Sequence, residues 1–289
     1  MAPPSDPDAL LDDLAAMVQQ NEEAVRPLDD ARYVDAHRTF EQASTQQAQI
    51  RRDIEVEGQR LVQSGYAPLD VLSVGCGCGM LDRPLLAHLA EDMESFVGVD
   101  PNPVAVAHCE QRLPSATSFP PIRIECSRFE DFDAPQRYDL VYCSHVFYYM
   151  DDRGAALRQM YAQLQEGGTL VIAHAPKTAM NALAQVFWSE HAQADFFDDD
   201  LRHLLDAYAP PSVTSRTIPA SIPRTLFSDA TPQGTLLLEF LIQAQWAPLP
   251  PQIQDGVQAY IDRHTCTDMA GRALLPHPAT TFVLRDGAS

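Results

Sequence analysis

The sequence is short of basic residues. It holds 20 Lys and Arg against 40 Asp and Glu, a formal net charge of −20 at pH 7. Such a charge repels a phosphate backbone and an anionic membrane surface, so we expect neither nucleic acid nor a membrane as a partner. The first 20 residues have no basic stretch before their apolar positions, and no apolar run approaches the length of a membrane span. We therefore expect a cytoplasmic protein.

Cysteine is also scarce. Six cysteines are spread over 289 residues, unlike the dense set that crosslinks a small secreted domain, and we expect reduced thiols. Cys76 and Cys78 lie close enough to form half of a metal site. A structural metal site needs four ligands, and no second pair of cysteines or histidines follows at short spacing, so we expect no metal.

Short apolar runs alternate with helical segments between residues 69 and 175. The runs are LDVLSVG, SFVGVD, IRIEC, YDLVYCS and TLVIAHA, and a glycine turn at Gly167 and Gly168 precedes the last one. With 45% hydrophobic residues, the chain can bury a large core. This alternation predicts an α/β fold with a doubly wound, mostly parallel sheet and helices on both of its faces.

The flanking regions are mostly helical in pattern. Tyr33, His37 and Phe40 share one face of a predicted helix, and Ser44 can cap the next helix, which Gly65 ends. Further helices are predicted near residues 180–190, 198–208, 234–245 and 252–262. The segments VTSRTI and TTFVLRD look extended, and they could form an antiparallel edge of the same sheet.

A glycine-rich loop ends the first strand. In LSVGCGCGM, residues 72–80, three glycines alternate with two cysteines, and Asp100 ends the second strand about 20 residues later. Bare backbone lets a ligand approach closely, and a carboxylate at this distance can accept hydrogen bonds from the hydroxyls of a ribose. The loop lacks the Gly-Lys-Ser/Thr of a P-loop and the G-x-G-x-x-G spacing of dinucleotide sites. A nucleoside without a pyrophosphate fits better; an ordinary tight turn is the alternative.

The four segments VLSVGCGCG, FVGVDPN, YDLVYCSHVFYYM and LRQMYAQLQEGGTLVIAHA occur in this order. Over residues 68–175 the chain thus resembles the class I methyltransferases, Rossmann-like enzymes that use S-adenosylmethionine. The resemblance implies that Gly75, Gly77 and Gly79 line the methionine part of that cofactor. It places Asp100 and Pro101 at the ribose, and Ser144 behind the sulfonium. It also implies that the adenine is bordered by Ser127, Arg128 and Phe129.

A longer likeness extends over most of the chain after residue 30. YVDAHRTFEQAST, HVFYYMDD, DDDLRHLLDAY and TTFVLRD occur in the order found in the histamine N-methyltransferase family, which the chain resembles. That resemblance implies a substrate pocket lined by Tyr33, His37, Phe40, Gln46, His145, Tyr148 and Tyr149. Gln46 stands where that family has a glutamate. Losing a charge-assisted contact in a closed pocket costs about 2 to 5 kcal/mol, so we expect a small acceptor other than histamine.

The expected reaction is methyl transfer to a small molecule, most readily at nitrogen. Oxygen or sulfur is the next candidate, and a non-catalytic protein that binds the cofactor is another. The catalytic candidates are His145, Tyr148 and Tyr149: aromatic faces stabilise the shared positive charge, and His145 could act as a base or a hydrogen-bond donor. The alternative for His145 is a hydrogen bond to the backbone that shapes the pocket.

Residues 1–30 are rich in Pro, Asp and Ala, which predicts a flexible acidic N-terminus that contains a frayed helix. We expect residues 31–289 to form a single methyltransferase domain. Within that domain we expect lid helices over 31–65, the cofactor-binding core over 66–175, and substrate-side helices and the last strands over 176–289. We expect a monomer or a weak homodimer.

Overall fold

The computed structural model describes residues 7–114, 119–187, 196–208 and 212–286. Its contacts divide the chain into two compact units. The helical unit comprises Met1–Gln46, Lys177–Asp195 and Pro219–Pro278, and the sheet unit comprises Gln47–Pro176, Phe196–Ile218 and Ala279–Ser289. Each unit is described by itself. Within the described residues, no helix combines the length and the apolar character needed to cross a bilayer.

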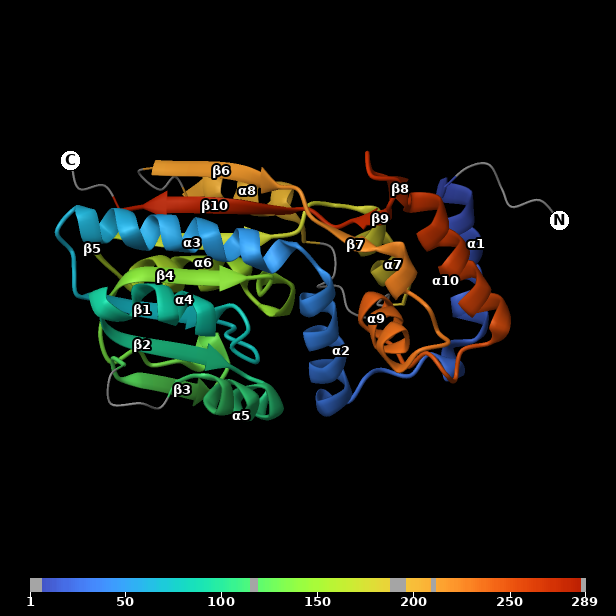
Figure 1. Ribbon diagram of the computed structural model, residues 1–289, viewed down its shortest axis with the longest axis horizontal. Helices are drawn as coiled ribbons and strands as arrows, with labels where there is room; N and C mark the ends of the chain where they lie inside the picture. The colour runs from blue at the N-terminus through green and yellow to red at the C-terminus, as the bar shows by residue number, and fades with distance from the viewer. Residues whose placement is uncertain (1–6, 115–118, 188–195, 209–211, 287–289) are drawn as a thin grey trace. The chain divides into compact units, whose positions relative to one another are not determined.

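A seven-stranded sheet organises the described part of the sheet unit, with the strand order β3-β2-β1-β4-β5-β10-β6 (Figure 1). Strands β1 to β5 pair in parallel, and β10 is antiparallel to both of its neighbours. This confirms the predicted doubly wound, mostly parallel sheet. The strands are β1 (Leu69–Val74), β2 (Met93–Asp100), β3 (Ile122–Cys126), β4 (Tyr138–Ser144), β5 (Leu164–His174), β6 (Ser212–Ile218) and β10 (Ala279–Arg285).

Helices cover both faces of this sheet, as the alternating pattern predicts. On one face, apolar side chains of α3 (Gln46–Gln63), α4 (Asp82–Leu89) and α5 (Pro103–Arg112) form a core with β1, β2 and β4. On the other face, α6 (Arg153–Ala162) and α8 (Asp198–Tyr208) pack against the opposite side chains of the same strands. Leu72 belongs to one core and its neighbour Val71 to the other, as expected where successive side chains point to opposite sides of a sheet.

Three local predictions concern α3, α8 and β5. The Ser44 hydroxyl accepts a hydrogen bond from the Gln46 backbone N–H at 3.1 Å, which confirms the cap of α3. The segment 198–208 is α8, as predicted. The predicted turn at Gly167 and Gly168 is wrong, because both residues lie inside β5. Gly167 has φ +77°, and the pairing of β5 with β4 shifts there, so an irregularity replaces the turn.

The helical unit is built from helices and a three-stranded sheet of order β7-β9-β8 in its described residues. One apolar core joins side chains from α1, α7, α9 and α10. The sequence predicts an acidic helix within residues 1–30, and residues 7–20 form α1, because Leu10, Leu14 and Val18 recur at helical spacing and pack into this core. The division into domains and the roles of their parts stay predictions. The elements are α1 (Pro7–Gln20), α2 (Asp30–Ala43), α7 (Ala179–Phe187), α9 (Pro232–Ile242), α10 (Pro251–His264), β7 (Ser221–Pro223), β8 (Cys266–Thr267) and β9 (Ala273–Pro276).

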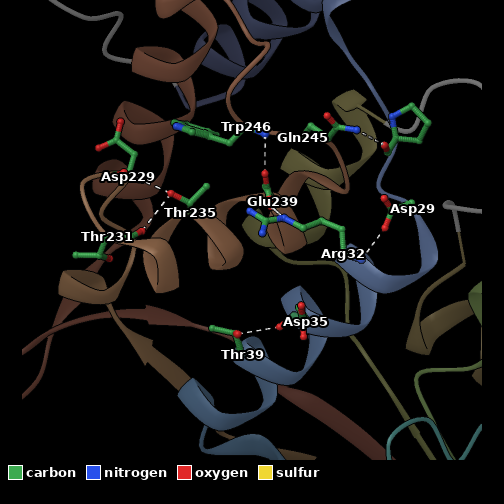
Figure 2. A network of polar contacts seen from close by, with 11 residues as sticks. Asp29, Arg32, Asp35, Thr39, Asp229, Thr231, Thr235, Glu239, Gln245 and Trp246 are labelled. Carbon is green, nitrogen blue, oxygen red and sulfur yellow. Dashed lines mark hydrogen bonds and ion pairs between the residues drawn. The ribbon is translucent and has the colours of Figure 1, made fainter. Parts of the chain in front are cut away.

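A polar network ties α2 to α9 inside the helical unit. Figure 2 shows Arg32 reaching from α2 to the nearly buried Glu239 of α9, with Nε and Oε2 2.5 Å apart. The other carboxylate oxygen of Glu239 accepts the backbone N–H of Trp246 at 3.1 Å. A buried carboxylate is costly without such partners, so this network fixes the pairing of the two helices.

Candidate functional site

The candidate site lies in the sheet unit, where the strand order reverses. Strand β1 has β2 on one side and β4 on the other. The chain continues from β1 to β2 and β3 on one side of β1, and it then crosses to β4 and β5 on the other side. In open α/β sheets, ligands bind outside the carboxyl ends of the strands at such a point. The glycine loop after β1, Asp100 at the end of β2, and Ser144 at the end of β4 all belong to this edge.

The glycine loop has the backbone that its composition suggests. Gly75, Gly77 and Gly79 have φ of +71°, +52° and +70°. A Cβ on Gly75 would lie 2.2 Å from Cγ1 of Val146, so packing alone requires glycine there. A Cβ on Gly77 would meet nothing within 4 Å, so the surface beside Gly77 is open. Glycine at position 75 is therefore needed for packing, whereas the open surface beside Gly77 leaves room for a ligand.

Asp100 fastens the loop to the second strand. Its Oδ2 accepts a hydrogen bond from the backbone N–H of Gly77 at 2.9 Å, and its Oδ1 accepts the N–H of Asn102 at 2.9 Å. A carboxylate can accept about four hydrogen bonds, so one carboxylate can hold a loop and contact a ligand at the same time. The sequence predicts that the glycine loop and Asp100 lie close together, and in the structure they are hydrogen-bonded.

The cysteines of the loop are buried thiols. Cys76 is 7% exposed and Cys78 is 3% exposed, and neither forms a disulfide. A hydrogen bond with Cys109, followed by burial, raises the pKa of Cys76 well above its usual range, so this thiol stays protonated and is a poor metal ligand. Among the described residues, no group of three or more His, Cys, Asp or Glu is arranged to hold a metal.

The residues expected near the adenine follow β2 and β3. The backbone N–H of Ser127 donates to the Asp100 carbonyl at 3.2 Å, and the Pro101 carbonyl lies 3.8 Å from Sγ of Cys126. Arg128 is held by Glu130 and Asp151, and both carboxylates raise its pKa. Phe129 is 3% exposed and belongs to the core, where its ring contacts Phe132. Their contact with a cofactor stays a prediction.

The end of β4 carries the candidate catalytic residues. His145 has φ +58°, a left-handed conformation that is uncommon for a residue with a Cβ, and its N–H donates to the Ala173 carbonyl at 2.9 Å. Its ring is stacked with that of Tyr148, with centroids 6.4 Å apart. Burial raises the pKa of Tyr148 well above its usual value. Tyr149 is 49% exposed. The structure therefore brings His145, Tyr148 and Tyr149 together at one strand end.

The remaining expected substrate residues belong to the helical unit. On α2, the rings of Tyr33 and His37 stack with centroids 5.8 Å apart, and Phe40 packs on Phe240 of α9 at 4.3 Å. The Gln46 amide donates to the His277 carbonyl at 3.0 Å. Tyr33, His37 and Phe40 thus form one aromatic cluster, as their spacing predicts, and Phe240 completes it. Their role towards a substrate stays a prediction.

Sequence reasoning missed two polar features near the strand ends. His174, the last residue of β5, is fully buried, with its ring 4.4 Å from that of Tyr148. Tyr142 of β4 donates a 2.5 Å hydrogen bond to Oδ1 of Asp82 in the first turn of α4. His174 and Tyr142 lie in apolar strands, and their polar or aromatic partners are distant in sequence. The one available signal was an acid directly after the glycine loop.

Comparison with known families identifies the same region. The family described as "Methyltransferase domain" matches residues 72–170, which run from β1 through most of β5. The match therefore contains the glycine loop, Asp100 and the segment after β4.

Two curated relatives illustrate the sequence similarity. A "Ubiquinone biosynthesis O-methyltransferase" of Rhodopseudomonas palustris is 30% identical over 105 residues, 36% of this chain and 39% of that protein. A "Malonyl-[acyl-carrier protein] O-methyltransferase 1" of Ilyobacter polytropus is 21% identical over 123 residues, 43% of this chain and 44% of that protein. The chain thus spans less than half the length of these relatives.

Solved structures share the fold over more of the chain. The plantazolicin methyltransferase BpumL, solved with a desmethylPZN analog and SAH, superposes with a TM-score of 0.54 and 11% identity, covering 97% of this chain and 98% of that one. The YcgJ protein of Bacillus subtilis gives a TM-score of 0.53 and 13% identity, covering 81% and 99%. At this identity the likeness concerns the fold. Residues 72–170 thus resemble a methyltransferase domain in sequence, and the chain shares the fold of these solved structures.

Proposed function

We propose that this chain transfers a methyl group from S-adenosylmethionine to a small molecule. The observation that carries the proposal is the contact between Gly77 and Asp100 beside open space. The two residues combine bare backbone with a carboxylate at the edge where open α/β sheets bind ligands. In this proposal Gly75, Gly77 and Gly79 hold the methionine part, and Asp100 accepts hydrogen bonds from the ribose.

The bound cofactor would supply the electrophilic methyl group, so this chain's residues need only orient the acceptor, exclude water and stabilise charge. Tyr148 and His145 suit that work, because their stacked rings lie directly after β4. An aromatic face near a sulfonium stabilises its positive charge. The backbone hydrogen bond of His145 fixes its position without using its ring.

The acceptor atom separates two versions of the proposal. Nitrogen is the acceptor that the sequence favours through its resemblance to histamine N-methyltransferase. The names of the curated relatives, which are O-methyltransferases, favour oxygen as the second candidate. Labelled methyl transfer to a panel of amines and alcohols distinguishes the two, and transfer to no acceptor would support a protein that only binds the cofactor.

Cofactor binding is tested first by calorimetry with S-adenosylmethionine and by the shift in melting temperature that a ligand of the native state produces. We expect binding by the natural sequence and loss of binding in Asp100→Ala. The matched control is Asp133→Ala, which removes an exposed carboxylate from the same unit and leaves binding unchanged. Equal affinity in Asp100→Ala and Asp133→Ala would refute the role given to Asp100.

A further inference from the structure

Two buried polar groups lie together at the carboxyl ends of β4 and β5. They are the hydroxyl of Tyr148 and Nδ1 of His174, and the centroids of their rings are 4.4 Å apart. Nδ1 of His174 has no hydrogen-bond partner among the described residues. The Ala175 backbone N–H lies near the Tyr148 oxygen and lowers the pKa of that hydroxyl, but the hydroxyl hydrogen has no acceptor among the described residues. A buried polar group without a partner is costly, so two together at a strand end indicate a site built for a ligand.

The chemistry of His174 is fixed by its other nitrogen. Nε2 lies 2.9 Å from the Phe196 carbonyl, which can only accept, so Nε2 carries the hydrogen and Nδ1 presents a lone pair. Burial, with a smaller contribution from His145, lowers the pKa of His174 to about 3. His174 is therefore neutral near pH 7 and can only accept a hydrogen bond through Nδ1.

The hydroxyl of Tyr148 supplies the complementary donor. Burial keeps it protonated, and the carboxylate of Asp198 acts in the same direction. Asp198 itself is occupied on Oδ2 by the hydroxyl of Thr280 at 2.5 Å. The two side chains thus offer one acceptor at His174 and one donor at Tyr148.

The charges nearby disfavour a charged ligand group. Arg153 lies over the Phe196 ring at 4.6 Å, and its positive charge also lowers the pKa of His174, so a cation beside His174 meets repulsion. A carboxylate has no hydrogen to donate to Nδ1 of His174, so its oxygen lone pairs would repel the lone pair of that nitrogen. An ammonium group has no lone pair for the hydrogen of Tyr148.

We propose that Tyr148 and His174 bind the methyl acceptor through an uncharged group that both donates and accepts a hydrogen bond, a hydroxyl or an uncharged amine. This inference rests on the proposed function and specifies the acceptor class of the same site. His174 acts here as a positioning residue, because it orients the group that receives the methyl.

Tyr148→Phe tests the proposal against a matched control, Tyr138→Phe. Tyr138 begins β4 at the opposite end, and its hydroxyl is also buried without a partner among the described residues. Each substitution removes a buried hydroxyl whose hydrogen has no acceptor among the described residues, so both variants should melt close to the temperature of the natural protein. Only Tyr148→Phe should weaken acceptor binding, by about 3- to 10-fold for the loss of one neutral hydrogen bond.

The probes are four methyl-substituted benzenes, added to the full chain saturated with S-adenosylhomocysteine. We expect 4-methylphenol and 4-methylaniline to bind and 4-methylbenzoate and 4-methylbenzylammonium to bind at least tenfold more weakly. Binding of a neutral probe should also shift the ¹⁵N resonance of His174 Nδ1. Equal binding of the charged probes, no binding of the neutral ones, or equal effects of the two tyrosine variants would overturn the proposal. Failure of S-adenosylhomocysteine to bind would instead refute the proposed function itself.

Discussion

Substitution of Gly77 by alanine separates backbone strain from ligand contact. Gly77 has φ +52°, and a Cβ built there meets nothing within 4 Å. Gly65, which follows α3, has φ +88° and the same open surroundings. Alanine in the left-handed region costs about 1 to 2 kcal/mol at either position, so Gly77→Ala and Gly65→Ala should lower the melting temperature by similar amounts, a few degrees.

The two variants should differ when the cofactor is added. A methyl group on residue 77 would occupy the space assigned to S-adenosylmethionine, and overpacking of this kind costs about 1 to 3 kcal/mol. Calorimetry should therefore show a Kd about 5- to 150-fold higher for Gly77→Ala, and an unchanged Kd for Gly65→Ala. Equal dissociation constants for Gly77→Ala and the natural protein would refute the assignment of the open surface beside Gly77.

Further predictions concern the strand ends. His145→Gly should be more stable to urea than His145→Ala by about 1 kcal/mol, because only glycine adopts φ +58° without strain; a more stable alanine variant would contradict the strained geometry. Tyr142→Phe should lower the free energy of unfolding by about 1 to 3 kcal/mol, since it removes the donor to the buried Asp82, and unchanged urea denaturation would contradict that contact. His174 has a pKa of about 3 in the native state against 6.5 in the unfolded chain, so the unfolded state binds more protons between these pH values. The free energy of unfolding should therefore fall as the pH falls from 6.5 towards 3, by up to about 1.4 kcal/mol per pH unit. His174→Gln should flatten that slope, and an equal slope in the variant would assign the effect to other groups.

Much of the sheet could be predicted because its signal is local. Five apolar runs became β1 to β5, and the two extended segments near the C-terminal half became β6 and β10. The glycine loop and Asp100 were found from spacing alone. The turn predicted at Gly167 was wrong, because one residue with positive φ can interrupt the pairing of a strand without ending the strand.

The polar environment of the site could not be predicted in this way. His174 ends an apolar run, and its burial and its tautomer depend on Phe196, a residue brought to it by the fold. The contact between Tyr142 and Asp82 likewise joins a strand to a helix 60 residues away. Phe240 has the spacing of an ordinary apolar residue in a helix, and only the fold of the helical unit places its ring against Phe40. Such features depend on tertiary packing, which a local sequence pattern does not reveal.

A structure of the protein crystallised with S-adenosylhomocysteine tests the central claim most directly. The account predicts both ribose hydroxyls within hydrogen-bonding distance of the Asp100 carboxylate and the amino-acid part of the ligand beside Gly77. A ligand bound elsewhere, or a ribose that makes no contact with Asp100, would contradict it.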